Sequence, residues 1–206
     1  MNVKKILSRV ASIIKLFIII LLLNSNSRAE EKNIKSYSDD KGILALMYHR
    51  FDENKYPSTN IQMDVFKQQI KIIRNLKYNF YNPKDLEKNF RISKIKKKIL
   101  ITIDDAFSSF YEVAWPYLKE EKIPFILFVS TEAIGKNGYM SWDQIKELEK
   151  ENIAYIGNHS HTHDYLVDLK NSDFINDINT ASKIFIKINI RFPPLITFIR
   201  KTINVI

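Results

Sequence analysis

The stretch ILITIDD at residues 99–105 decides the fold, because in it a continuous apolar run ends in two carboxylates. A short, uninterrupted apolar run rich in β-branched residues is typical of a strand buried on both faces. Similar runs occur at residues 43–48, 125–129 and 153–156. Apolar residues at helical spacing lie between these runs, at residues 65–76, 107–118 and 142–148, with an expected break at Pro116. Buried strands that alternate with helices predict parallel β/α units and therefore an α/β fold.

Two polar clusters follow strands of this series. Asp104 and Asp105 close the strand at residues 99–103, and the pentapeptide HSHTH, residues 159–163, comes soon after the strand at residues 153–156. Sites in barrels of β/α units gather on the loops after the carboxyl ends of the strands. We therefore expect the two clusters to meet there.

The residue types in these clusters suit a metal centre. His159 and His163, with one carboxylate, supply three ligands for zinc and leave an open position for water. A second aspartate beside that water can accept its proton. His161, between the two candidate ligands, is expected outside the ligand set. The pattern predicts a metal-dependent hydrolase.

Each cluster also has a simpler interpretation. An Asp-Asp pair after a strand often caps the next helix, and a histidine-rich loop can be a surface segment that binds metal without catalysis. Either cluster alone favours the simpler interpretation. Their conjunction on successive strands of one β/α series favours an enzyme.

The amino-terminal residues have the composition of a secretory leader. Residues 1–29 contain five basic residues, no acidic residue and the apolar run at residues 16–23. That run is too short for a membrane-spanning helix, which needs about 20 residues. We expect a cleaved signal peptide at residues 1–29 and an exported protein that is periplasmic, in the cell envelope or extracellular. An uncleaved leader that tethers the chain to the membrane is the alternative.

The remaining chain is predicted to hold one domain. Residues 30–41 are polar and indicate a linker, and residues 42–206 contain no repeats or low-complexity tracts. The absence of cysteine excludes disulfides and thiolate ligands, which leaves histidine and carboxylate for any metal. Much of the net charge of +9 belongs to the leader. The lysine cluster near residues 94–98 lacks interleaved aromatic residues, so we expect no nucleic-acid partner.

The two clusters resemble the motifs of a known family. Residues 101–105, ITIDD, are similar to the TFDD motif of the polysaccharide deacetylases (carbohydrate esterase family 4, the NodB-homology domain), and residues 159–163 fit their H-[S/T]-x-x-H motif. The resemblance covers about residues 43–190. Further similar segments occur in the family's order at residues 46–50, 116–124, 128–131 and 141–144.

The resemblance implies a fold and a reaction. The fold is an incomplete, distorted (β/α) barrel of the NodB-homology type. Asp104 is implied as the general base, and Asp105, His159 and His163 as ligands of zinc or another divalent transition metal. The implied reaction is hydrolysis of N-acetyl, or less often O-acetyl, groups on a polysaccharide or oligosaccharide substrate.

Two other residues have open interpretations. His49 matches a histidine of one branch of the family that orients a catalytic group or touches substrate, and a hydrogen-bonded histidine at a strand end is the alternative. Trp142 either stacks on a sugar ring or belongs to the core, and the core is the more common place for an aromatic residue at a helix start.

The carboxyl-terminal residues depart from the family pattern. Pro193 and Pro194 approach a Tyr-Pro-Phe-Gly type segment that does not follow, and no histidine follows His163 to supply the family's general acid. We therefore expect a truncated or frame-shifted reading frame that changes near residues 188–197. Two hypotheses remain: an exported metal-dependent polysaccharide deacetylase, or a catalytically inactive remnant that binds glycans as a pseudoenzyme.

Overall fold

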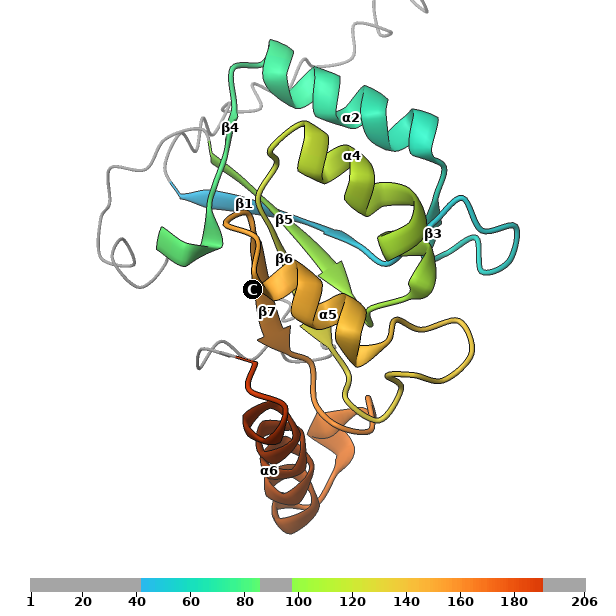
Figure 1. Cartoon of the computed structure of the whole chain (residues 1–206), viewed down its shortest axis with the longest axis vertical. Helices are drawn as coiled ribbons and strands as arrows, with labels where there is room; N and C mark the ends of the chain where they lie inside the picture. The colour runs from blue at the N-terminus through green and yellow to red at the C-terminus, as the bar shows by residue number, and fades with distance from the viewer. Residues whose placement is uncertain (1–41, 86–97, 191–206) are drawn as a thin grey trace, which may run out of the picture. The chain divides into compact units, whose positions relative to one another are not determined.

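Parallel strands form the central sheet of the computed structural model, which describes residues 42–85 and 98–190 (Figure 1). The strands follow the order β1-β5-β6-β7, and β4 pairs with the first residues of β5. Every pairing is parallel, as the apolar runs predict. The strand bounds are β1 Ile43–Tyr48, β4 Asn79–Phe80, β5 Lys98–Asp104, β6 Phe125–Val129 and β7 Ala154–Asn158.

Helices connect successive strands of the sheet (Figure 1). The long loop after β1 also contains a two-stranded parallel pair, β2 with β3. The remaining bounds are β2 Arg50–Phe51, β3 Asn60–Ile61, α2 Met63–Asn75, η1 Pro83–Asp85, η2 Phe110–Ala114, α4 Trp115–Glu120, α5 Trp142–Glu149, η3 Leu166–Asp168 and α6 Asn171–Lys187.

The expected strands and two of the expected helices are confirmed, and the helix expected at residues 107–118 begins one residue later. Phe107 lies before the helical region and pairs with Tyr139 in an isolated antiparallel bridge. The π-helical segment η2 runs directly into α4, and Pro116 lies in the first turn of α4. Because proline has no N–H to donate to the preceding turn, the regular α-helical pattern is interrupted there. The expected break at Pro116 therefore appears as a π-helical segment directly before it, with the chain helical on both sides.

The two faces of the sheet have different neighbours. Alternate residues of β5, β6 and β7 pack with the buried faces of α2, α4 and α5 in the main core. Residues of the opposite parity, Leu100, Ile126 and Phe128, form a smaller buried cluster on the other face. Helices outside and a second apolar layer inside are the arrangement of an incomplete (β/α) barrel.

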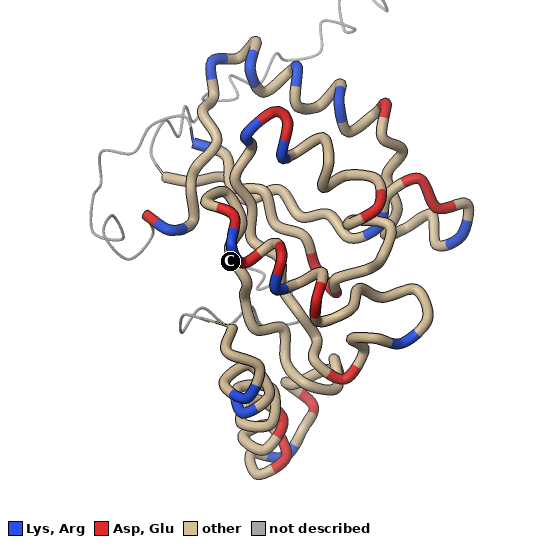
Figure 2. Tube along the Cα trace, in the orientation of Figure 1, with Lys and Arg blue, Asp and Glu red and all other residues tan. Residues whose placement is uncertain are grey.

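The exposed side of α2 carries most of that helix's charge. Figure 2 shows Lys and Arg positions along its length, and Lys67, Lys71 and Arg74 are exposed there. Phe66, Ile70 and Ile73 are buried on the opposite side. This division is that of an amphipathic helix that covers a core.

Several expectations concern residues outside the described ranges. The signal peptide at residues 1–29, the linker at residues 30–41, most of the lysine cluster and the altered segment beyond residue 190 all lie there, and these expectations stay predictions. None of the helices within residues 42–85 and 98–190 is long and apolar enough to cross a bilayer.

Candidate metal centre

The strand register places Asp104 and His159 on the same face of the sheet. Asp104 is opposite Phe128 of β6, and Phe128 is opposite Gly157 of β7. Because side chains alternate along a strand, His159 has the same parity as Gly157 and continues that face beyond β7. The ring of Phe128 lies 6.0 Å from the His159 ring, centroid to centroid. Asp104 and His159 therefore converge at the carboxyl edge of the sheet.

Asp105 reaches this edge through an unusual backbone. Adjacent residues of a regular strand point to opposite faces, but Asp105 and Ala106 have φ angles of 71° and 56°. This left-handed conformation is uncommon for residues other than glycine. It turns the chain sharply after β5, so the carboxylates of both aspartates lie near His159.

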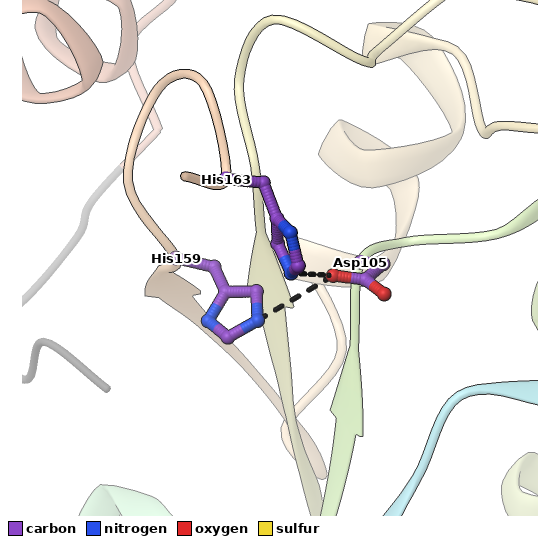
Figure 3. Close-up of side chains that lie close together, drawn as sticks. All are labelled: Asp105, His159 and His163. Carbon is purple, nitrogen blue, oxygen red and sulfur yellow. Dashed lines mark ion pairs between the residues drawn. The ribbon is translucent and has the colours of Figure 1, made fainter. Parts of the chain in front are cut away.

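The three expected ligands meet within one small space (Figure 3). Oδ1 of Asp105 lies 2.9 Å from Nε2 of His163 and 3.4 Å from Nε2 of His159. Each of the three residues offers a ligand atom within 4.8 Å of the others. The side chains of His159 and Asp105 are 5% and 12% exposed, whereas that of His163 is 42% exposed. The cluster is closed on the sheet side and open at His163.

The donor set fits a divalent transition metal. Ligand atoms 2.0–2.1 Å from a tetrahedral zinc ion are separated by roughly 3.3 Å, close to the separations observed here. Oδ1 of Asp105 is buried and receives no hydrogen bond of good geometry from the described residues. A buried carboxylate oxygen without a donor is costly unless something else satisfies it. A cation shared with the two imidazoles would do so.

Asp105 and His163 shift each other's pKa values. Burial works to raise the pKa of Asp105, but the rings of His159 and His163 outweigh burial and hold that pKa below its ordinary value. The Asp105 carboxylate in turn raises the pKa of His163. The cluster therefore stabilises a charged carboxylate, which is the form that binds a metal.

Asp104 has a different environment from its neighbour. Its Oδ2 lies 3.8 Å from Nε2 of His159, and its Oδ1 is buried without a hydrogen bond from the described residues. Burial raises the pKa of Asp104, while the charges of His159 and His49 oppose that change. His49 directly follows β1 and is half-buried. The structure thus brings His49 near Asp104 and outside the three-residue cluster.

A buried aspartate that sequence reasoning did not identify fixes the histidine loop. Asp177 of α6 accepts hydrogen bonds from the backbone N–H groups of His161 and Thr162, at 2.7 and 2.9 Å, and from the Thr162 hydroxyl at 2.7 Å. Ser160 and His163 have φ angles of 73° and 63°. Asp177 holds the loop in this shape through three donors.

Ser160 provides a second set of hydrogen bonds that fixes the histidine loop. Its N–H donates to Oδ1 of Asn158 at 2.8 Å, and its hydroxyl accepts from the backbone N–H of His163 at 3.1 Å. His161 lies outside the ligand cluster, as expected, and its Nδ1 is 2.8 Å from the Thr131 hydroxyl. Trp142 packs edge-on against Phe185, with ring centroids 5.9 Å apart, which confirms its place in the core.

A pocket of about 440 Å³ opens beside the cluster. Asp105 and His163 line it, so a bound molecule would contact the candidate metal ligands directly. The other lining residues are Arg50, Tyr56, Thr59, Phe107, Ser130, Glu132, Ala133, Lys136, Tyr139, His161 and Thr162.

Comparison with protein families and known proteins agrees with this site. The family model described as polysaccharide deacetylase matches residues 91–200, more than half of the chain, and the chain belongs to this family. The match includes both aspartates and the histidine motif.

The chain is also similar to individual curated proteins. The chain is 26% identical over 176 residues to a poly-beta-1,6-N-acetyl-D-glucosamine N-deacetylase of Staphylococcus aureus, an alignment that covers 72% of this chain and 61% of the relative. The chain thus spans about three fifths of the length of the curated relatives of this name.

Solved structures show the same architecture. IcaB from Ammonifex degensii is 28% identical, with a TM-score of 0.64 over 72% of this chain and 70% of that one. The Streptococcus pyogenes deacetylase PplD, solved in complex with acetate, is 22% identical, with a TM-score of 0.67 over 77% and 74% of the two chains. At this identity the second likeness concerns the fold alone.

Proposed function

We propose that this chain is an exported, zinc-dependent hydrolase that removes N-acetyl groups from a polysaccharide. One observation carries the proposal: Oδ1 of Asp105 and Nε2 of both His159 and His163 converge beside a second buried carboxylate and an open pocket. The name of the Staphylococcus aureus relative supports poly-N-acetylglucosamine as the glycan. O-acetyl groups are the alternative target.

The four residues divide the chemical work. Asp105, His159 and His163 would hold the cation through one carboxylate oxygen and two imidazole nitrogens. A divalent cation bound there polarises a carbonyl oxygen and acidifies water. Asp104, held close by but outside the ligand set, has a free buried oxygen for the proton of the attacking water. The raised pKa of Asp104 favours this acceptance.

The reaction balances with one water molecule. The oxygen of water bonds to the acetamide carbonyl carbon while its proton passes to Asp104. The C–N bond then breaks as Asp104 passes that proton to the sugar nitrogen, which leaves as an amine. Acetate and a free amino sugar are the products. His49, whose charge acts on Asp104, is proposed to orient that carboxylate or to contact the substrate.

Export and attachment are part of the proposal. The basic and apolar composition of residues 1–29 supports secretion to the periplasm, cell envelope or extracellular space. The same segment, if retained, would tether the domain at the membrane surface where envelope glycans lie.

Acetate release from defined oligosaccharides tests the function. The chain without residues 1–29 would be loaded with zinc and incubated with β-1,6-linked and β-1,4-linked N-acetylglucosamine pentamers. We expect release from the β-1,6-linked pentamer. Asp104→Asn should lower the rate by a factor of roughly 10² to 10⁴ with zinc still bound, because a general base contributes about that much.

Two outcomes would count against the proposal. Acetate release that is insensitive to Asp104→Asn would mean that another group is the base or that a contaminant is responsible. Zinc binding without release from either pentamer would favour the glycan-binding pseudoenzyme instead.

A further inference from the structure

Four side chains form a continuous stack along the wall of the pocket. The guanidinium carbon of Arg50 lies over two rings, 3.4 Å from the Phe107 ring centroid and 4.3 Å from the Tyr56 ring centroid. The Phe107 ring is tilted by 35° against the Tyr139 ring, with centroids 4.9 Å apart. All four residues line the pocket that contains Asp105. We name these four residues the arginine stack.

Hydrogen bonds fix the guanidinium within the stack. Nη1 of Arg50 donates to Oε2 of Glu53 at 2.9 Å, and Oε1 of Glu53 accepts from the Ser109 hydroxyl at 2.6 Å. The Ser109 oxygen also accepts from the backbone N–H of Phe51 at 3.2 Å. The Arg50 side chain is only 15% exposed. Arg50 is therefore held in one orientation before any ligand binds.

Most of the guanidinium donors are left for a ligand. A guanidinium carries five N–H groups, and among the described residues only Glu53 accepts a hydrogen bond from Arg50. Because Arg50 lines the pocket, its remaining donors are available on that side. The Arg50 nitrogens that make no hydrogen bond are not among the fully buried, unpartnered side-chain atoms of the described residues, so a molecule in the pocket can reach them.

Tyr56, the exposed member of the stack, suits a ligand that has an apolar face. The Tyr56 side chain is 54% exposed, although one side of its ring faces the guanidinium. Tyr56 also has a φ angle of 61°, a conformation that costs free energy in a residue other than glycine. A sugar ring has a C–H face that packs on an aromatic ring and hydroxyl oxygens that accept hydrogen bonds. The arginine stack offers a partner for each.

We propose that the arginine stack is a second sugar subsite, which binds the residue next to the one that loses its acetyl group. Phe107 follows Asp105 by two residues, a span of at most about 7 Å of chain, so the subsite lies within reach of a neighbouring unit of the polymer. The subsite rests on the proposed function for its substrate class. It predicts that the protein binds a chain of sugars more tightly than a single sugar.

Binding measurements test the subsite without turnover. The affinity of the zinc-loaded Asp104→Asn chain for N-acetylglucosamine and for its β-1,6-linked trimer would be measured by calorimetry. We expect the trimer to bind more tightly than the monomer. Tyr56→Ala and Arg50→Lys should each weaken trimer binding roughly fivefold, in line with the loss of one stacked or bidentate contact, and leave monomer binding unchanged.

An exposed tyrosine outside the pocket gives the matched control. Tyr165 is 55% exposed, against 54% for Tyr56, and does not line the pocket. Tyr165→Ala should keep the trimer affinity. The subsite is refuted if the trimer binds no better than the monomer, or if the two stack variants leave trimer affinity unchanged or weaken both sugars equally. Absent acetate release from the wild-type chain, with the trimer preference intact, would refute only the hydrolase.

Discussion

The ring of Phe128 occupies the space that a side chain at Gly157 would need. A Cβ atom at position 157 would overlap Cδ1 and Cε1 of that ring. The two residues are paired across β6 and β7, so the glycine lets Phe128 lie flat against the neighbouring strand. Because Phe128 also faces the His159 ring, this contact helps to set the position of a candidate metal ligand.

Gly157→Ala should therefore destabilise the fold. Forcing one extra methyl group into a packed site costs about 1–3 kcal/mol, because either Phe128 or the strand must move. Urea unfolding measures the change. Adding Phe128→Leu should recover part of the loss in the double variant, since a smaller side chain vacates the space. A double variant whose losses simply add would show that the two residues do not compete.

Each of the three candidate ligands should be required for metal binding. We expect His159→Ala, His163→Ala and Asp105→Asn to lower zinc affinity by a factor of roughly 100 or more, beyond what loss of an outer-shell partner costs. Calorimetric titration with zinc measures this. His161→Ala is the matched control from the same loop and should bind zinc like the wild type.

Bound zinc should also stabilise the folded chain. At a free zinc concentration of 100 times the dissociation constant, the free energy of unfolding should rise by about 2.7 kcal/mol. The increase should disappear with a chelator and in His163→Ala. An equal increase in that variant would place the metal elsewhere.

Asp177 should support both stability and metal affinity. Asp177→Ala removes a buried acceptor of three hydrogen bonds and leaves the donors of His161 and Thr162 unpaired, at a cost of about 3 kcal/mol. Zinc affinity should fall by a factor of roughly 10 to 100 as the loop loosens. Asp173→Ala changes an exposed aspartate in the first turn of the same helix and is the control; it should cost at most about 1 kcal/mol and leave zinc affinity unchanged. If Asp177→Ala left zinc affinity unchanged, the hydrogen bonds between Asp177 and the histidine loop would not contribute to metal binding.

Tyr48 should make stability depend on alkaline pH. Burial raises the pKa of Tyr48 to about 12, whereas an unfolded tyrosine titrates near 10. Between these values the unfolded chain loses the proton first, so the free energy of unfolding falls as pH rises from about 10 to about 12. Tyr48→Phe lacks this group and the hydrogen bond to Gln69.

The stability gap between wild type and Tyr48→Phe isolates this titration. At pH 8 the gap reflects the lost hydrogen bond, and it should shrink as pH rises above 10. Denaturant unfolding across this range measures it. A gap that stays constant to pH 12 would show that Tyr48 does not titrate differently in the two states.

The sequence predicts the strands β5, β6 and β7 well because each is buried on both faces and reads as an unbroken apolar run. The strand β1 reads in the same way, although Leu44 and Met47 are exposed. It also predicts which three residues lie together in the candidate metal centre, since residue type and order after a strand determine which side chains can reach the carboxyl edge. The role of Asp104 as general base and the catalytic role of His49 stay predictions. The sequence does not predict the left-handed φ angles at Asp105 and Ala106 that place Asp105 at the carboxyl edge of the sheet, because neither residue is a glycine.

Long-range polar contacts were the part that sequence reasoning missed. Asp177 carried a readable signal, since Asp177, Ala181 and Phe185 lie four residues apart on the buried side of α6. An acid on an apolar stripe indicates a specific partner. The contact of Arg50 with Phe107 joins residues far apart in the chain and has no local periodicity to reveal it.

The left-handed turn at Ala106 limits which mutations this lineage can accumulate. Ala106 is not itself a candidate ligand, yet its φ of 56° strongly disfavours β-branched replacements and favours glycine or asparagine. Backbone conformation alone therefore restricts substitution at a position next to the candidate site.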